Sequence, residues 1–126
     1  MKNKFFQLVM LLISVSFILS SCNNDENETK YPKEVQITYK VTSTNTTTAQ
    51  AISYKNETGG MTTLTNVALP FSKTITRTVN KNDDASIGYS STNTSASVKL
   101  EILVDNTQVK SQVFNAGTGA IIYLFQ

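Results

Sequence analysis

Few side chains in this 126-residue sequence are suited to chemistry. There is no histidine, which removes the commonest general base at neutral pH and the commonest metal ligand. Neither a Gly-rich phosphate loop nor a Gly-x-Ser-x-Gly nucleophile elbow is present. The carboxylates of the C-terminal part fall at expected turns or solvent faces and do not converge: Glu34, Glu57, Asp83, Asp84, Glu101 and Asp105. We therefore expect a protein that is not an enzyme and that needs no cofactor.

Asp83 and Asp84 come closest to a metal-binding pattern. Together with Asn80 and Asn82 they supply oxygen ligands of the kind that Ca²⁺ prefers. Their spacing, however, does not match the Asp-x-Asp-x-Asp-Gly calcium loop, and a turn that contains two acids is the commoner explanation. We predict a turn here and no metal site.

Phe71, Lys73 and Arg77 form a candidate contact patch for a partner protein. Phe71 follows Pro70, where a strand is expected to begin, and the two basic residues share its alternation. The alternative is that Phe71 plugs the end of the core and that Lys73 and Arg77 guard the edge of a sheet. Four tyrosines fall on apolar positions, where burial with a tethered hydroxyl is expected: Tyr39, Tyr54, Tyr89 and Tyr123.

The remaining reactive residue is Cys22, the only cysteine. Lys2 and Lys4 precede a mostly apolar run over residues 5–19, which at about 15 residues is short of the roughly 20 that a membrane-spanning helix needs. The sequence Leu-Ser-Ser-Cys at residues 19–22 resembles the lipobox of bacterial lipoproteins. We expect cleavage before Cys22 and attachment of lipid to its sulfur, which consumes a thiol that would be unusual in an exported protein. The alternative is a signal anchor with a chance cysteine.

Removal of residues 1–21 changes the charge of the chain. The signal peptide takes Lys2 and Lys4 from the eleven basic residues, so the mature chain balances the nine acidic ones. This neutrality excludes nucleic acid as an expected partner, because phosphate binding needs a concentrated basic face. Residues 22–33 contain almost no apolar side chain and predict a flexible acidic tether. Its acids resemble the export signals of surface lipoproteins in the Bacteroidota, although a solvated spacer explains them equally well: Asp25, Glu26 and Glu28.

Residues 34–126 predict a single all-β domain. Apolar residues alternate with polar ones, as in Val35, Ile37, Tyr39 and Val41, and residues 96–104 show the strongest alternation. Turn residues recur about every ten positions, and no 3.6-residue helical repeat appears. We predict an antiparallel, immunoglobulin-like β-sandwich of seven or eight strands, with a small closed barrel as the alternative. Residues 121–125 are apolar on both faces and predict a strand in the middle of a sheet.

Three segments resemble successive signatures of the MmpS family of small mycobacterial membrane proteins. They are ITYKVT at 37–42, NVALPFSKT at 66–74 and VDNTQV at 104–109, of which the second is the most specific. The resemblance spans roughly residues 35–125. It implies a small extracytoplasmic β-sandwich, and the mycobacterial members act as accessory subunits of RND-type exporters of lipids and siderophores.

This sequence departs from that family in its anchor and in its core. The mycobacterial proteins carry a transmembrane helix, and many have a cysteine pair in the domain and a tryptophan after Leu-Pro, where this chain has Phe71. Two functions therefore remain open. The first is an outer-membrane lipoprotein, facing the periplasm or the cell surface, whose sandwich docks on an envelope protein such as an RND-type transporter. The second is a lipoprotein that binds a glycan, lipid or peptide.

Overall fold

The computed structural model describes residues 30–126, so the predicted signal peptide and the predicted lipidation site at Cys22 lie outside the described residues. The described part contains eight β-strands and no helix, and hence no helix able to span a membrane. The strands are β1 (Lys33–Ser43), β2 (Thr48–Lys55), β3 (Met61–Ala68), β4 (Phe71–Val79), β5 (Asp84–Ser90), β6 (Ser97–Val104), β7 (Thr107–Asn115) and β8 (Thr118–Leu124).

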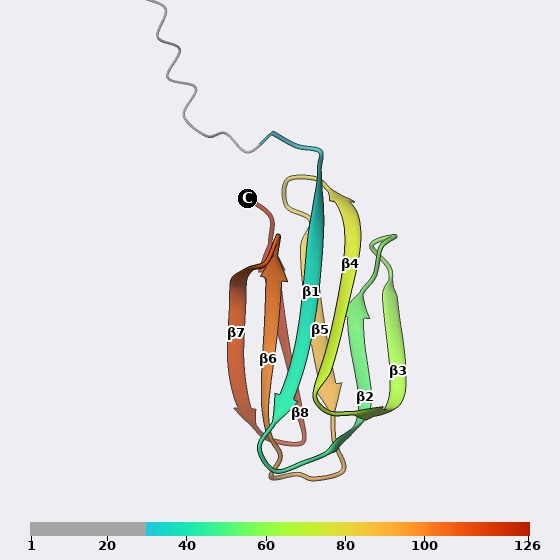
Figure 1. Ribbon diagram of the computed structural model, residues 1–126, viewed down its shortest axis with the longest axis vertical. Coiled ribbons are helices and arrows are strands. Elements are labelled where there is room, and N and C mark those ends of the chain that lie inside the picture. Colours follow the sequence, from blue (N-terminus) through green and yellow to red (C-terminus); the bar gives the residue numbers. More distant parts are fainter. Residues whose placement is uncertain (1–29) are drawn as a thin grey trace, which may run out of the picture.

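The strands form two four-stranded antiparallel sheets that pack face to face (Figure 1). Sheet A has the order β4-β1-β6-β7, and sheet B has the order β3-β2-β5-β8. Neither sheet closes on itself, so the predicted β-sandwich is confirmed and the closed barrel is not formed. The described chain starts and ends at the same end of the sandwich, where the Tyr31 hydroxyl donates a hydrogen bond of 2.9 Å to the carbonyl of Gln126.

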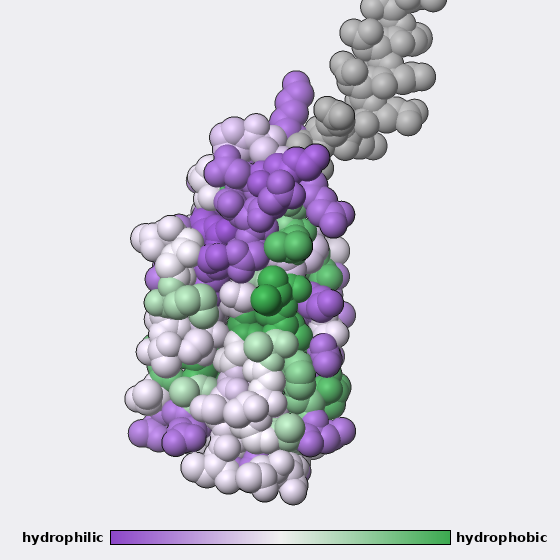
Figure 2. Space-filling model, turned by 180° about the vertical axis from the view of Figure 1, so that it is seen from behind, coloured by the Kyte–Doolittle hydropathy of each residue, from purple (hydrophilic) through white to green (hydrophobic). Residues whose placement is uncertain are grey.

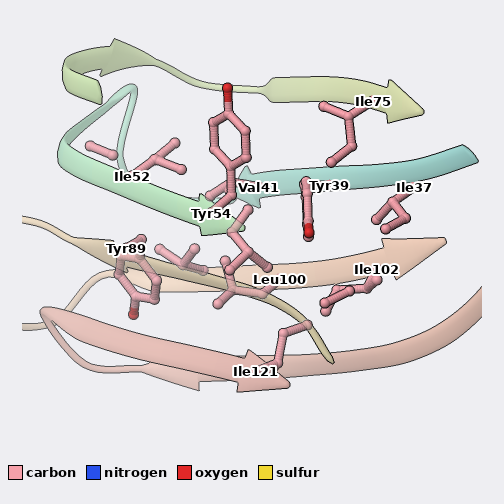
Figure 3. Close-up of a cluster of buried hydrophobic side chains, with 14 of the residues drawn as sticks. Ile37, Tyr39, Val41, Ile52, Tyr54, Ile75, Tyr89, Leu100, Ile102 and Ile121 are labelled. Carbon is pink, nitrogen blue, oxygen red and sulfur yellow. The ribbon is translucent and has the colours of Figure 1, made fainter. Parts of the chain in front are cut away.

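Alternating side chains fill the space between the sheets (Figure 3). In β1 the inward residues Val35, Ile37, Tyr39 and Val41 are all buried, as predicted. The central strand β6 contributes Val98, Leu100 and Ile102, each fully buried. Full burial of one such side chain is worth about 1.5–3 kcal/mol. The side chains that the two-residue alternation directs inward therefore hold the two sheets together.

Two hairpin turns show the backbone geometry that their residue types favour. Asp105 and Asn106 join β6 to β7 with φ angles of 48° and 65°, as a type I′ turn requires. Gly59, in the turn between β2 and β3, has a φ of 80°. Residues that tolerate the left-handed conformation therefore stand where the chain reverses.

β8 is an edge strand, and the prediction of a central strand at residues 121–125 was wrong. It pairs with β5 alone. Ile121 and Phe125 point inward and are buried, whereas Ile122 and Leu124 are 57% and 53% exposed. A strand that is apolar on both faces can be buried on both or can present one apolar face to solvent, and the sequence pattern is the same in the two cases. By contrast, the alternative interpretation that Lys73 and Arg77 lie on an edge strand agrees with the position of β4 at the edge of sheet A.

Gly119 has a steric role in a strand and does not form part of a turn. The loop between β7 and β8 is Ala116–Gly117, and Gly119 lies inside β8. A Cβ atom on Gly119 would lie 2.5 Å from Cγ of Phe114, so the absence of a side chain makes room for that ring. Phe114 in turn packs edge-on against Tyr89 at a centroid distance of 6.1 Å.

Candidate functional site

The predicted contact patch on β4 does not form one continuous surface. Phe71 is half-buried against the core, with its ring centroid 6.3 Å from that of Tyr54. Lys73 is exposed, but Arg77 is only 5% exposed. The Arg77 side chain is therefore too buried to contact a partner protein in this conformation. A contact role for Lys73 and the exposed part of Phe71 stays a prediction.

Arg77 instead ties β4 to the start of β5. Its Nη2 atom donates a hydrogen bond of 2.8 Å to the carbonyl of Asp84 and lies 4.0 Å from Oδ2 of Asp83. Its Nη1 atom is buried and has no hydrogen-bond partner within residues 30–126. The expectation that Arg77 is a solvated guard of the edge was wrong, because the side chain turns into the end of the sandwich.

The Tyr39 hydroxyl lies near this guanidinium. It donates a hydrogen bond of 2.8 Å to the carbonyl of Lys55. Burial raises the pKa of Tyr39 well above its ordinary value, and the positive charge of Arg77 opposes that rise without cancelling it. Tyr39 therefore remains a neutral hydrogen-bond donor and is not suited to act as a base at neutral pH.

A polar hollow of about 280 Å³ opens beside Arg77. It is lined by Lys55, Glu57, Thr58, Gly59, Arg77, Thr78, Asn80 and Asp83. Its lining carries two positive and two negative side chains: Lys55 and Arg77 against Glu57 and Asp83. The hollow therefore carries no excess charge that would select an ion.

Asp83 and Asp84 have separate structural tasks. Oδ2 of Asp83 accepts a hydrogen bond of 2.8 Å from the backbone N–H of Asn80, which closes the turn between β4 and β5. Asp84 is engaged by Lys55. Within residues 30–126, no three side chains of the metal-ligating acidic, histidine or cysteine types come together. The arrangement favours the turn interpretation over the calcium interpretation.

A different surface, the outer face of sheet B, combines small and apolar side chains. Because Ile52, Tyr54, Ile87 and Tyr89 point inward, the residues between them point outward. The strand register sets Ala51 beside Ser90 and Ser53 beside Gly88, and it continues to Thr118 and Ala120 on β8. These small residues border a shallow depression of about 470 Å³, lined by Ala51, Ser53, Gly88, Tyr89, Ser90, Thr118, Gly119 and Ala120.

Large apolar side chains stand beside this depression. Ile122 and Leu124 project from β8, and Met61, which is 57% exposed, projects from β3 at the other margin. Figure 2 shows this side of the molecule, with a hydrophobic patch beside weakly polar surface. Hydrophilic residues gather instead at the end of the sandwich where the described chain begins. We call the depression together with Met61, Ile122 and Leu124 the sheet B face.

Sequence reasoning missed the sheet B face. The available signal was the outward set of β8, which consists of two small residues followed by two large apolar ones and contains no charge: Thr118, Ala120, Ile122 and Leu124. That signal was assigned to burial in the middle of a sheet. No protein-family model matches the chain, and no curated protein matches it either.

Proposed function

We propose that this protein is a lipid-anchored, non-catalytic interaction module that docks on another protein of the cell envelope through its sheet B face. The observation that carries the proposal is the exposure of Ile122 and Leu124 beside a depression of small side chains. Contiguous exposed apolar surface is costly in water and is typical of protein contact sites.

The distribution of charge supports a protein partner. The depression is lined by no charged residue, and the nearby Lys55 and Asp84 form an ion pair with each other. Depletion of charge at the centre with polar groups at the rim is the composition of protein–protein interfaces. The outer face of sheet A differs, because Lys99 and Glu101 form an ion pair of 3.0 Å there and Thr38 bonds to Thr74.

The alternative function, capture of a glycan, lipid or peptide, has weaker support. The depression has the volume of a small-ligand site, but such sites enclose the ligand and converge several polar groups on it. Here the lining is shallow, and its aromatic residue, Tyr89, points into the core. Its hydroxyl is engaged by the carbonyl of Ala116.

The anchor is part of the proposal. Lipid on Cys22 would hold the sandwich beside the membrane, with two or three acyl chains needed for stable attachment. Labelled palmitate should be incorporated into the wild-type chain and not into Cys22→Ala. The resemblance to the MmpS family makes an RND-type transporter the first envelope partner to test.

Site-specific photocrosslinking in the native cell tests the docking face. A photoreactive residue at Ser53, on the sheet B face, should crosslink to a defined envelope protein. The same residue at Thr76, on the outer face of sheet A, is the matched control because it lies on an exposed strand surface of the other sheet. Equal crosslinking at the two positions, or none at Ser53, would contradict the proposal.

A further inference from the structure

Four strands lie at sheet edges, and three of them carry features that discourage pairing with another strand. β4 has Lys73 and Arg77 on its inward positions. β7 has Lys110 opposite inward-facing Ile102, together with a register shift. β3 has Asn66 at a φ of 52°, which interrupts its extended backbone. Inward charges and irregular backbone are the devices by which edge strands avoid pairing.

β8 carries none of these devices. Its seven residues, Thr118–Leu124, include no charge and no proline, and none of its φ angles is positive. Two of its large apolar side chains, Ile122 and Leu124, are each more than half exposed. A regular, uncharged and apolar edge is a template for an added strand.

The hydrogen-bond pattern shows which residues of β8 face the free edge. Beyond the two ends of the β5–β8 pairing, Ser91 N donates to Gly117 O at 2.7 Å and Phe125 N donates to Asp83 O at 2.9 Å. In an antiparallel ladder the bonded residues alternate, so the odd-numbered residues of β8 bond to β5. The even-numbered residues direct their N–H and C=O groups outward: Thr118, Ala120, Ile122 and Leu124.

We infer that β8 pairs antiparallel with β8 of a second copy of this chain about a two-fold axis at Ile121. This inference goes beyond the proposed function, because it concerns the β8 margin of the sheet B face and a second copy of this chain. In that register Ala120 lies opposite Ile122 of the second copy, and Thr118 lies opposite its Leu124. Both pairs consist of residues whose backbone groups are free, and the two-fold axis repeats each pair. Each of these four pairs can exchange two hydrogen bonds, so about eight can form. Each large side chain then covers a small one on the same face.

The absence of charge makes β8 better suited to pair with a second copy of itself than β4 or β7. A symmetric pair brings identical strands together, so two β4 or two β7 edges would oppose their own lysines, and like charges across strands are destabilising. The β8 pair opposes none. It joins the two B sheets into one continuous surface that presents both depressions to the same side.

The position of the tether is compatible with this symmetry. The two-fold axis of an antiparallel strand pair is perpendicular to the sheet, so both anchors reach one membrane when sheet B lies parallel to it. The described chain begins at Lys30 at one end of the sandwich, and the eight residues 22–29 can span at most about 28 Å. That reach is nearly three times the roughly 10 Å spacing of stacked sheets.

Disulfide crosslinking in the cell membrane tests the register. Differently tagged chains carrying Ala120→Cys and Ile122→Cys should form a mixed disulfide when expressed together, because opposed residues of a bonded pair have Cα atoms about 5.5 Å apart. Chains with Ala120→Cys alone should not crosslink above the level of the wild type, since the two copies of that residue are diagonal to each other. Absence of the mixed disulfide, or equal yields from both combinations, would overturn the inference.

Sedimentation of the full mature lipoprotein in detergent provides an independent measurement. Ile122→Lys should weaken self-association at least roughly tenfold, since it opposes charge to an apolar edge. Val113→Lys on β7 is the matched control, because Val113 is 55% exposed and also lies on an edge strand. Ala120→Pro should also weaken association, because it removes one outward N–H and leaves the β5 ladder intact.

A chain that is monomeric at every concentration would overturn the inference. So would a dimer whose association is unchanged by both Ile122→Lys and Ala120→Pro. If Ser53 still crosslinks to a different envelope protein in that case, the proposed function stands without the dimer. If the β8 disulfide forms while Ser53 crosslinks to no other protein, self-pairing stands and docking on another envelope protein fails.

Discussion

The edge strands β4 and β8 occupy equivalent places in the architecture, because each lies at one edge of its sheet (Figure 1). Their side chains nevertheless differ in charge and in exposure. β4 places basic residues on its inward positions and buries one of them, Arg77. β8 places apolar residues on both faces and exposes Ile122 and Leu124. The fold determines which strands are edges, whereas the side chains determine whether an edge remains closed to other chains. Edge chemistry is therefore informative about function where core chemistry is not.

The largest effect on stability is expected at the β4 side of this comparison. Arg77→Ala removes a buried side chain and leaves the carbonyl of Asp84 without its donor. We expect the free energy of unfolding to fall by about 2–4 kcal/mol, measured by urea denaturation. Arg77→Met keeps the aliphatic volume without the charge and should lose less than half as much. An equal loss in the two variants would show that the hydrogen bond, and not the packing, dominates.

The next effect tests the inward packing of β8. Gly119→Ala places a methyl group against the Phe114 ring and should cost about 1–3 kcal/mol of unfolding free energy, because the ring must move within a packed core. Gly60→Ala is the control, since a methyl group there meets only ordinary contacts, the nearest at 3.4 Å. If the two variants are equally stable, the ring has space to move, and β8 is held less tightly than the structure indicates.

The fold was largely predictable from the sequence, and particular residues show why. The alternation of Val35, Ile37, Tyr39 and Val41 encodes one buried face, and the Asp105–Asn106 pair encodes a tight turn, because both are local properties of the chain. The sheet order depends on contacts between distant segments, such as β1 with β6, and leaves no local trace. For that reason the edge position of β8 could not be predicted from the sequence, and neither could the sheet B face that depends on it.

The fate of Arg77 was unpredictable for a related reason. Lys73 and Arg77 share one strand and one alternation, yet the first is exposed and the second is buried. The difference arises because the start of β5, with the Asp84 carbonyl, passes close to Arg77. A sequence shows the charge of a side chain but not the partner that tertiary structure brings to it.

A smaller effect concerns Tyr39, whose hydroxyl lies next to the Arg77 end of β4. Tyr39→Phe removes the hydrogen bond to Lys55 and should cost about 1 kcal/mol at neutral pH. The folded-state pKa of Tyr39 is raised by burial, so the unfolded chain loses this proton first. The contribution of Tyr39 to stability should therefore be level up to about pH 10, the ordinary tyrosine pKa, and should fall above it by up to about 1.4 kcal/mol per pH unit.

The comparison with Tyr39→Phe isolates this residue. The variant should show a shallower decline above that pH than the wild type, because the raised pKa of Tyr39 no longer contributes to it. Parallel slopes in Tyr39→Phe and the wild type would mean that Tyr39 titrates normally and that its burial is incomplete in solution.

The smallest effect on stability is expected where the effect on association is greatest. Ile122→Ser alters a side chain that is 57% exposed, and exposed substitutions away from special features usually change the free energy of unfolding by less than about 0.5 kcal/mol. If β8 forms the proposed interface, however, the same change removes the apolar side chain that covers Ala120 of the second copy. Val113→Ser, at 55% exposure on β7, should be equally mild for folding and should leave association intact. Urea denaturation and sedimentation on the same samples separate these outcomes. A stability loss of several kcal/mol in Ile122→Ser alone would mean that this side chain serves the fold, and the contrast between a closed β4 edge and an open β8 edge would no longer hold.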